Sequence, residues 1–176
     1  MISMISKESI AVMQKDIHAN AVNHGWWDGG IASRSNFNEI LLLIVGEVSE
    51  LHESFRRDTL LKQCDKKIGL TCLEEEGADI VIRLLDAMGA YGIEIRSDVY
   101  PWPKDADTAL GEICFEIVET ITDIRRHRNE WDKYAEKVIG LTMTLLWQYR
   151  RDLIHAIDVK HEYNKTRPYR HGGMKA

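Results

Sequence analysis

Residues 36–55, with the sequence NFNEILLLIVGEVSELHESF, indicate the fold class most clearly, because their apolar residues recur at intervals of three and four. That spacing places the apolar side chains on one face of an α-helix. Asn36 is a residue type that caps helix N-termini, and Glu39 follows three positions later, as in a capping box. We therefore predict a helix that begins near Asn36 and buries one stripe, formed by Phe37, Ile40, Leu41, Ile44, Val48, Leu51 and Phe55.

The same helical period recurs along most of the chain, and no segment shows the sustained alternation of a β-strand. Thr71 with Glu74 forms a second possible capping box, and Gly92 marks the end of that helix. Pro101 and Pro103 interrupt the pattern, because proline cannot continue a helix. The sequence therefore predicts an all-α fold, an antiparallel bundle of about five helices. The predicted helices lie at about residues 6–24, 36–55, 71–92, 108–128 and 131–157.

The length of 176 residues and the composition suit a single domain spanning residues 1–176. The net charge of −5 disfavours nucleic acids and anionic membranes as partners, because both repel negative charge. The longest apolar run, residues 40–45, is far shorter than a membrane-spanning helix, and the N-terminus lacks a signal-peptide pattern. The three cysteines form no CxxC pair and are predicted to be reduced. We therefore expect a cytoplasmic protein with no nucleic-acid or membrane partner.

Two acidic pairs lie beside the apolar stripes. Glu47 and Glu50 are three residues apart, as are Glu76 and Asp79, so each pair projects from one helix face. The 25 residues between the pairs are enough to turn the second helix antiparallel to the first. Four converging carboxylates require a cation between them, and Mg²⁺ prefers carboxylate oxygens. We predict that Glu47, Glu50, Glu76 and Asp79 form a metal site for Mg²⁺, with Mn²⁺ as a substitute. Solvated helix faces are the alternative.

The motif ExxE, followed after 25 residues by ExxD, resembles the MazG-like all-α nucleoside triphosphate pyrophosphohydrolases. The segment HANA at residues 18–21, the run Gly25-Trp26-Trp27, and the ending KHEYNKTRPYRHGG at residues 160–173 are similar to the same family. The resemblance covers residues 18–95 and 158–173. It implies Mg²⁺-dependent hydrolysis of a nucleoside or deoxynucleoside triphosphate to the monophosphate and pyrophosphate, and so control of the nucleotide pool. The catalytic residues that it implies are Glu47, Glu50, Glu76 and Asp79.

The resemblance also implies roles for residues outside the acidic pairs. Basic side chains in the tail of residues 158–176 would hold phosphate oxygens, and Trp26 and Trp27 would stack on the base. Each tryptophan could equally fill the core, and the tail could be solvated. From the residues alone, Arg83 and Asp86 are expected to pair with each other on adjacent turns. The predicted substrate-binding residues are Asn20, Trp26, Trp27, Lys160, Tyr163, Asn164, Lys165, Arg167 and Arg170.

The middle of the chain, which the family resemblance leaves out, looks like a degraded second copy of the acidic helix pair. Residues 47–57 align with residues 116–126 at a constant offset of 69, which matches both glutamates and both arginines. We interpret the predicted helix pair at about residues 108–157 as a degenerate repeat that packs on the pair at about residues 36–92. Amphipathic helices share patterns, so coincidence is the alternative.

The second copy does not repeat the whole acidic motif. At an offset of 60, Glu76 falls opposite Glu136, but Asp79 falls opposite Ile139. Because the copy lacks this carboxylate, we expect it to act as a scaffold. The residues left out of the predicted site on this ground are Glu116 and Glu119.

The sequence leaves two alternatives for function, and it does not fix the number of copies in the assembly. An enzyme is the favoured function, and the alternative is a non-catalytic nucleotide-binding or interaction bundle that kept the fold. A di-iron bundle would need paired Glu-x-x-His motifs, and Asp152 with His155 is only a single approximate match. A homodimer or higher homo-oligomer is expected, because twofold assemblies are the commonest.

Overall fold

The computed structural model describes residues 4–30 and 37–173, and within these ranges the chain is helical, with two isolated β-bridges and no strand. The predicted all-α fold is confirmed. No helix in these ranges is both long enough and apolar enough to cross a membrane. The helices are α1 (Lys7–Asn23), α2 (Phe37–Arg56), α3 (Cys72–Tyr91), α4 (Leu110–Arg126), the 3₁₀ helix η1 (Arg128–Glu130), α5 (Trp131–Gln148), α6 (Leu153–Lys165) and α7 (Arg170–Gly173).

Helices α2 and α3 form an antiparallel hairpin whose ends follow local sequence signals. The predicted capping box is present, since the Thr71 hydroxyl accepts from the Glu74 N–H and the Glu74 carboxylate accepts from the Thr71 N–H. Gly92 ends α3 in the left-handed conformation, with φ of 65°. The predicted cap of α2, Asn36, lies outside the described residues. The apolar stripe of α2 is buried as predicted except for Phe55, which is 49% exposed in the last turn, where the chain leaves the bundle.

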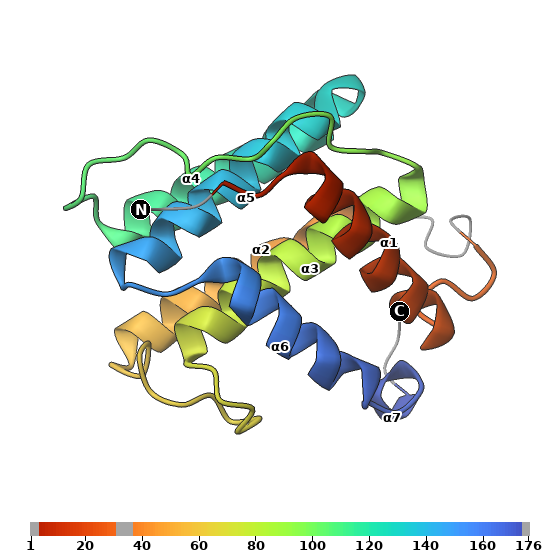
Figure 1. The fold of residues 1–176 in the computed structure, drawn as a ribbon, viewed down its shortest axis with the longest axis horizontal. Helices are drawn as coiled ribbons and strands as arrows, with labels where there is room; N and C mark the ends of the chain where they lie inside the picture. The colour runs from red at the N-terminus through yellow and green to blue at the C-terminus, as the bar shows by residue number, and fades with distance from the viewer. Residues whose placement is uncertain (1–3, 31–36, 174–176) are drawn as a thin grey trace.

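Helices α4 and α5 form a second antiparallel hairpin that packs on the first and completes a four-helix bundle (Figure 1). At one end of the bundle, Arg125 of α4 donates a hydrogen bond to Asn38 of α2 at 2.9 Å. At the same end, the ring centroids of Tyr91 and Trp131 lie 5.3 Å apart, joining α3 to α5. The predicted core residues of α4 are all buried, as the inner face of a bundle requires: Leu110, Ile113, Ile117, Ile121 and Ile124.

The prediction of one helix over residues 131–157 is wrong, because the chain turns between α5 and α6. Arg150 adopts a left-handed backbone conformation with φ of 57°, two residues after α5 ends. Asp152 then caps α6, since its carboxylate accepts from the backbone N–H of Ile154 at 2.9 Å. Because an arginine and not a glycine occupies the turn, the sequence carries no usual stop signal there.

Helix α3 packs against α1, α2, α5 and α6, so its residues face several elements at once (Figure 1). The polar tail predicted from residue 158 onward is partly helical, because α6 continues to Lys165. This correction matters for the site, since it places Lys160 between α6 and α3. Beyond α6, α7 returns toward the end of α1, where the Arg170 N–H donates to the His24 carbonyl at 3.0 Å.

Candidate metal centre and adjoining cavity

Three of the four predicted carboxylates converge where α2 and α3 run side by side. Glu47 and Glu50 come from α2 and Glu76 from α3, and one ligand oxygen from each lies within 4.8 Å of the others. Glu47 and Glu76 are buried, whereas Glu50 is exposed to solvent. The three-residue spacing on α2 and the antiparallel hairpin together produce this convergence.

The cluster holds more negative charge than the protein around it neutralises. Burial and the neighbouring carboxylates raise the pKa of Glu76 to about 9. A divalent cation at this point would offset the repulsion, and carboxylate oxygens are the ligands that hard cations prefer. The donor set therefore fits Mg²⁺ or Mn²⁺. The carboxylates that act on Glu76 are Glu75, Asp79, Glu47 and Glu50, in that order.

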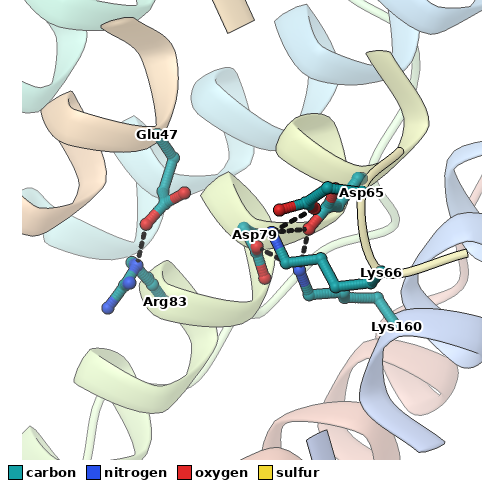
Figure 2. A network of polar contacts seen from close by, with 7 residues as sticks. Glu47, Asp65, Lys66, Asp79, Arg83 and Lys160 are labelled. Atoms are coloured by element: carbon teal, nitrogen blue, oxygen red, sulfur yellow. Dashed lines mark hydrogen bonds and ion pairs between the residues drawn. The ribbon is translucent and has the colours of Figure 1, made fainter. Parts of the chain in front are cut away.

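The fourth predicted carboxylate, Asp79, is bound by an ammonium group. Lys160 of α6 places its Nζ 2.6 Å from Asp79 Oδ2 and 2.5 Å from Glu75 Oε1. Burial lowers the pKa of Lys160, but the two carboxylates outweigh burial, so the pKa lies above its usual value and the ammonium stays charged. Figure 2 shows Lys160 and Lys66 reaching this network from α6 and from the loop between α2 and α3, and Lys66 Nζ also lies 2.5 Å from Glu75 Oε1.

Arg83 and Asp86 do not pair with each other, so that prediction is wrong. Arg83 forms an ion pair with Glu47 across the α2–α3 hairpin (Figure 2). Asp86 Oδ1 accepts hydrogen bonds from His18 Nδ1 and from Trp27 Nε1, each at 2.8 Å. Both residues bind neighbouring elements, and a pattern along one helix carries no information about such partners.

The two tryptophans that were predicted to stack on a base have different environments. Trp27 is 7% exposed and donates its indole N–H to Asp86, so it belongs to the core. Because its ring is enclosed by protein, this environment favours the alternative that Trp27 fills the core, and its stacking role stays a prediction. Trp26 is half-buried and lines a cavity, so its predicted role stays open.

That cavity, of about 480 Å³, lies beside the acidic cluster and is walled by α1, α2, α3 and α6. On α3 its wall contains Asp79, Arg83 and Asp86, which continue the face of Glu76 at spacings of three, four and three. Cavities of this size hold small-molecule ligands in other proteins. The predicted substrate-binding residues that line it are Asn20, Trp26, Asn164 and Arg167.

Two lysines that were predicted to grip phosphate are held by carboxylates of the protein. Lys160 is 1% exposed, enclosed between Glu75 and Asp79. Lys165 lies near the surface, with its Nζ 2.9 Å from Asp16 Oδ2. Each ammonium has protein oxygens as partners, and the predicted phosphate contacts of these lysines stay predictions.

The two arginines of the same segment differ in position. Arg167 lines the cavity, whereas Arg170 donates from Nε to the Gly25 carbonyl at 3.1 Å and from Nη2 to Asp28 Oδ2 at 3.3 Å. Arg170 therefore links α7 to the turn that carries Trp26, and its predicted phosphate contact stays a prediction. Tyr163 is half-buried on α6 and is not among the residues that line the cavity.

Sequence reasoning missed the different tasks of Glu74, Glu75 and Glu76. Successive helical residues point about 100° apart, so three adjacent acids cannot share one face. Glu74 caps α3, Glu75 binds Lys66 and Lys160, and Glu76 joins the acidic cluster.

Comparisons of the chain with protein-family models, with curated proteins and with solved structures find no match. Function must therefore be inferred from the residues and their geometry.

Proposed function

We propose that the protein hydrolyses a nucleoside or deoxynucleoside triphosphate to the monophosphate and pyrophosphate, using a divalent cation held by Glu47, Glu50 and Glu76. The observation that carries this proposal is the position of the three carboxylates beside a cavity lined by Trp26 and Arg167. The sequence resemblance to the MazG-like pyrophosphohydrolases supports the same reaction. Mg²⁺ is the expected cation, and Mn²⁺ would substitute for it.

The cavity has the parts that a nucleoside needs. Trp26 offers an aromatic face, on which a base of any type can stack. Ile40 and Leu43 of α2 add apolar wall, and the amides of Asn20 and Asn164 provide donors and acceptors for the edge of a base. This combination of aromatic, apolar and a few polar groups is typical of small-molecule sites.

The phosphates would extend from the cavity along α3 toward Glu76. Arg83 lines the cavity and lies seven residues from Glu76, which is about 10 Å along a helix. Arg167 reaches the same cavity from beyond the end of α6. Guanidinium groups bind phosphate oxygens in bidentate pairs, so these two arginines would orient the chain of phosphates.

The chemistry that a bound divalent cation supplies at such a site is neutralisation of phosphate charge and acidification of a water molecule. One carboxylate of the cluster would accept the proton of the attacking water. Lys160 would hold the Asp79 carboxylate at the cavity wall through its 2.6 Å contact, which keeps that charge in a fixed position.

A panel of nucleoside and deoxynucleoside triphosphates, assayed for pyrophosphate release with Mg²⁺, tests this proposal. Glu50→Gln should abolish release while helicity is retained, because it removes one ligand of the cation. Glu53→Gln is the matched control, since it makes the same change one turn further along α2, where Glu53 pairs with Arg56 and Arg57. Saturable nucleotide binding without pyrophosphate release would favour a non-catalytic nucleotide-binding bundle.

A further inference from the structure

Glu116 is an acidic residue of α4, and two lysines of the protein neutralise its charge. Its Oε1 lies 2.9 Å from Lys137 Nζ of α5, and its other oxygen forms an ion pair with Lys104. Burial raises the pKa of Glu116, but the hydrogen bonds from Lys104 and Lys137 outweigh burial and lower it. Glu119 lines the same surface hollow as these three residues.

The two hairpins place opposite charges at corresponding points. In the α2–α3 hairpin, Glu47 lies close to the carboxylate of Glu76 on the facing helix, and it also pairs with Arg83, which lies seven residues further along that helix. In the α4–α5 hairpin, Glu116 meets an ammonium of the facing helix, Lys137. The sequence alignment had set Glu136 opposite Glu76, but Glu136 accepts a hydrogen bond from the Ser97 hydroxyl at 2.8 Å. The residue of α5 that faces Glu116 is Lys137, one position after Glu136. An offset of 61 therefore relates α3 to α5.

The same offset sets Gly140 opposite Asp79, and no carboxylate can stand at that position. A Cβ on Gly140 would lie 2.7 Å from the carbonyl oxygen of Tyr100. The backbone of residues 100–104 passes along α5 here, and the Trp102 N–H donates to the Gly140 carbonyl at 2.9 Å. This segment therefore fills the space that a fourth carboxylate would need, and it places Lys104 next to Glu116.

We propose that the α4–α5 hairpin is a second copy of the α2–α3 hairpin, in which the ammonium groups of Lys104 and Lys137 occupy the place of a divalent cation. Two ammonium groups carry the charge of one divalent cation, and as covalent parts of the chain they do not exchange. The second hairpin thus completes the bundle within one chain. Among the described residues, one acidic cluster has the geometry to hold a cation, and its members are Glu47, Glu50 and Glu76.

Terbium(III), a hard cation that binds carboxylates and emits light when a nearby tryptophan is excited, tests the proposal in the full-length chain. The ring centroid of Trp102 lies 5.2 Å from Lys137 Nζ, so an ion at Glu116 would be close to this tryptophan. A background chain with Glu47→Gln and Glu50→Gln removes the first cluster. Into it we place Lys104→Gln with Lys137→Glu, which restores a carboxylate facing Glu116.

The restored variant should bind terbium with saturable tryptophan-sensitised emission, at least about tenfold more tightly than the background chain. Adding Trp102→Phe should remove the emission and so locate the ion. Lys104→Gln with Lys133→Glu is the matched control, because Lys133 lies on α5, carries the same charge and pairs with Glu130. The control should bind no more tightly than the background chain.

Two results would overturn the proposal. One is Trp102-dependent emission from the background chain, because its lysines would then not exclude a cation. The other is a restored variant that binds no better than the control. If circular dichroism shows that the restored variant does not fold, Lys104→Gln with Lys137→Gln replaces it. Mn²⁺ should then raise the Tm of that variant more than the Tm of the background chain, and an equal shift would also overturn the proposal.

Discussion

Lys160 Nζ lies 2.6 Å from Asp79 Oδ2, one helical turn from Glu76 on the same face of α3. The Lys160 ammonium of α6 therefore neutralises Asp79, whereas the proposed divalent cation would bind Glu76, one turn earlier on α3. Tertiary structure divides the carboxylates that the sequence groups together: Asp79 and Glu47 each pair with a cationic side chain of the protein, whereas Glu76 lies against other carboxylates. The following predictions test this division.

Lys160→Met should destabilise the protein by about 3–5 kcal/mol, the usual cost of leaving a buried charge without its partner. The loss falls mainly on Asp79, because Glu75 keeps Lys66. Urea unfolding monitored by circular dichroism measures the change. Lys165→Met is the control, since Lys165 pairs with Asp16 near the surface and such pairs contribute about 0–1 kcal/mol. Equal losses in the two variants would contradict the internal-cation role.

The free energy of unfolding of the metal-free protein should fall as pH rises through the neutral range. Glu76 has a folded-state pKa of about 9 against an ordinary value of 4.5. Between these values the folded state holds a proton that the unfolded state has lost, so stability decreases by about 1.4 kcal/mol per pH unit from this group. Below pH 4.5 both states hold the proton and the contribution is fully present.

Glu76→Gln should remove that slope and stabilise the metal-free protein at pH 8. Urea unfolding at pH 6 and pH 8 in the presence of a chelator provides the measurement, and Glu53→Gln provides the control. A pH dependence that is the same in Glu76→Gln and in the unmodified chain would show that Glu76 is not the titrating group.

Binding of Mg²⁺ or Mn²⁺ should release a proton near neutral pH and should become tighter as pH rises. The cause is Glu76, which must lose its proton before it can bind a cation. At a cation concentration of 100 times Kd, stability should rise by about 2.7 kcal/mol. Calorimetric titration in two buffers of different ionisation enthalpy counts the protons. Glu50→Gln should lose the effect and Glu119→Gln should keep it; the reverse result would move the cation to α4.

Trp26 and Trp27 should respond differently to substitution. Trp26→Ala should weaken nucleotide binding by about 1–3 kcal/mol with little change in stability, because its ring lines the cavity. Trp27→Phe should leave binding nearly intact but lower stability by about 1–3 kcal/mol, because Asp86 loses a hydrogen bond. Nucleotide titration and thermal unfolding of both variants separate these effects. A binding loss confined to Trp27→Phe would reverse the assignment.

The sequence by itself determined the features that depend on residues within about one helical turn. Thr71 and Glu74 specify the start of α3, and Gly92 specifies its end, because a capping box and a left-handed glycine are local interactions. The spacing of Glu47 and Glu50 specifies a shared helix face for the same reason. The all-α class follows from periodicity, which is also a local property.

Only the tertiary structure decided which charges meet. Asp79 binds Lys160, Asp86 binds Trp27, and Glu116 binds Lys137, and each pair joins segments that are far apart in the sequence. The turn at Arg150, which separates α5 from α6, made the first of these contacts possible by bringing α6 back across α3. Such pairs depend on how helices pack against one another, and helical periodicity specifies the buried face of a helix but not the charged group that faces it.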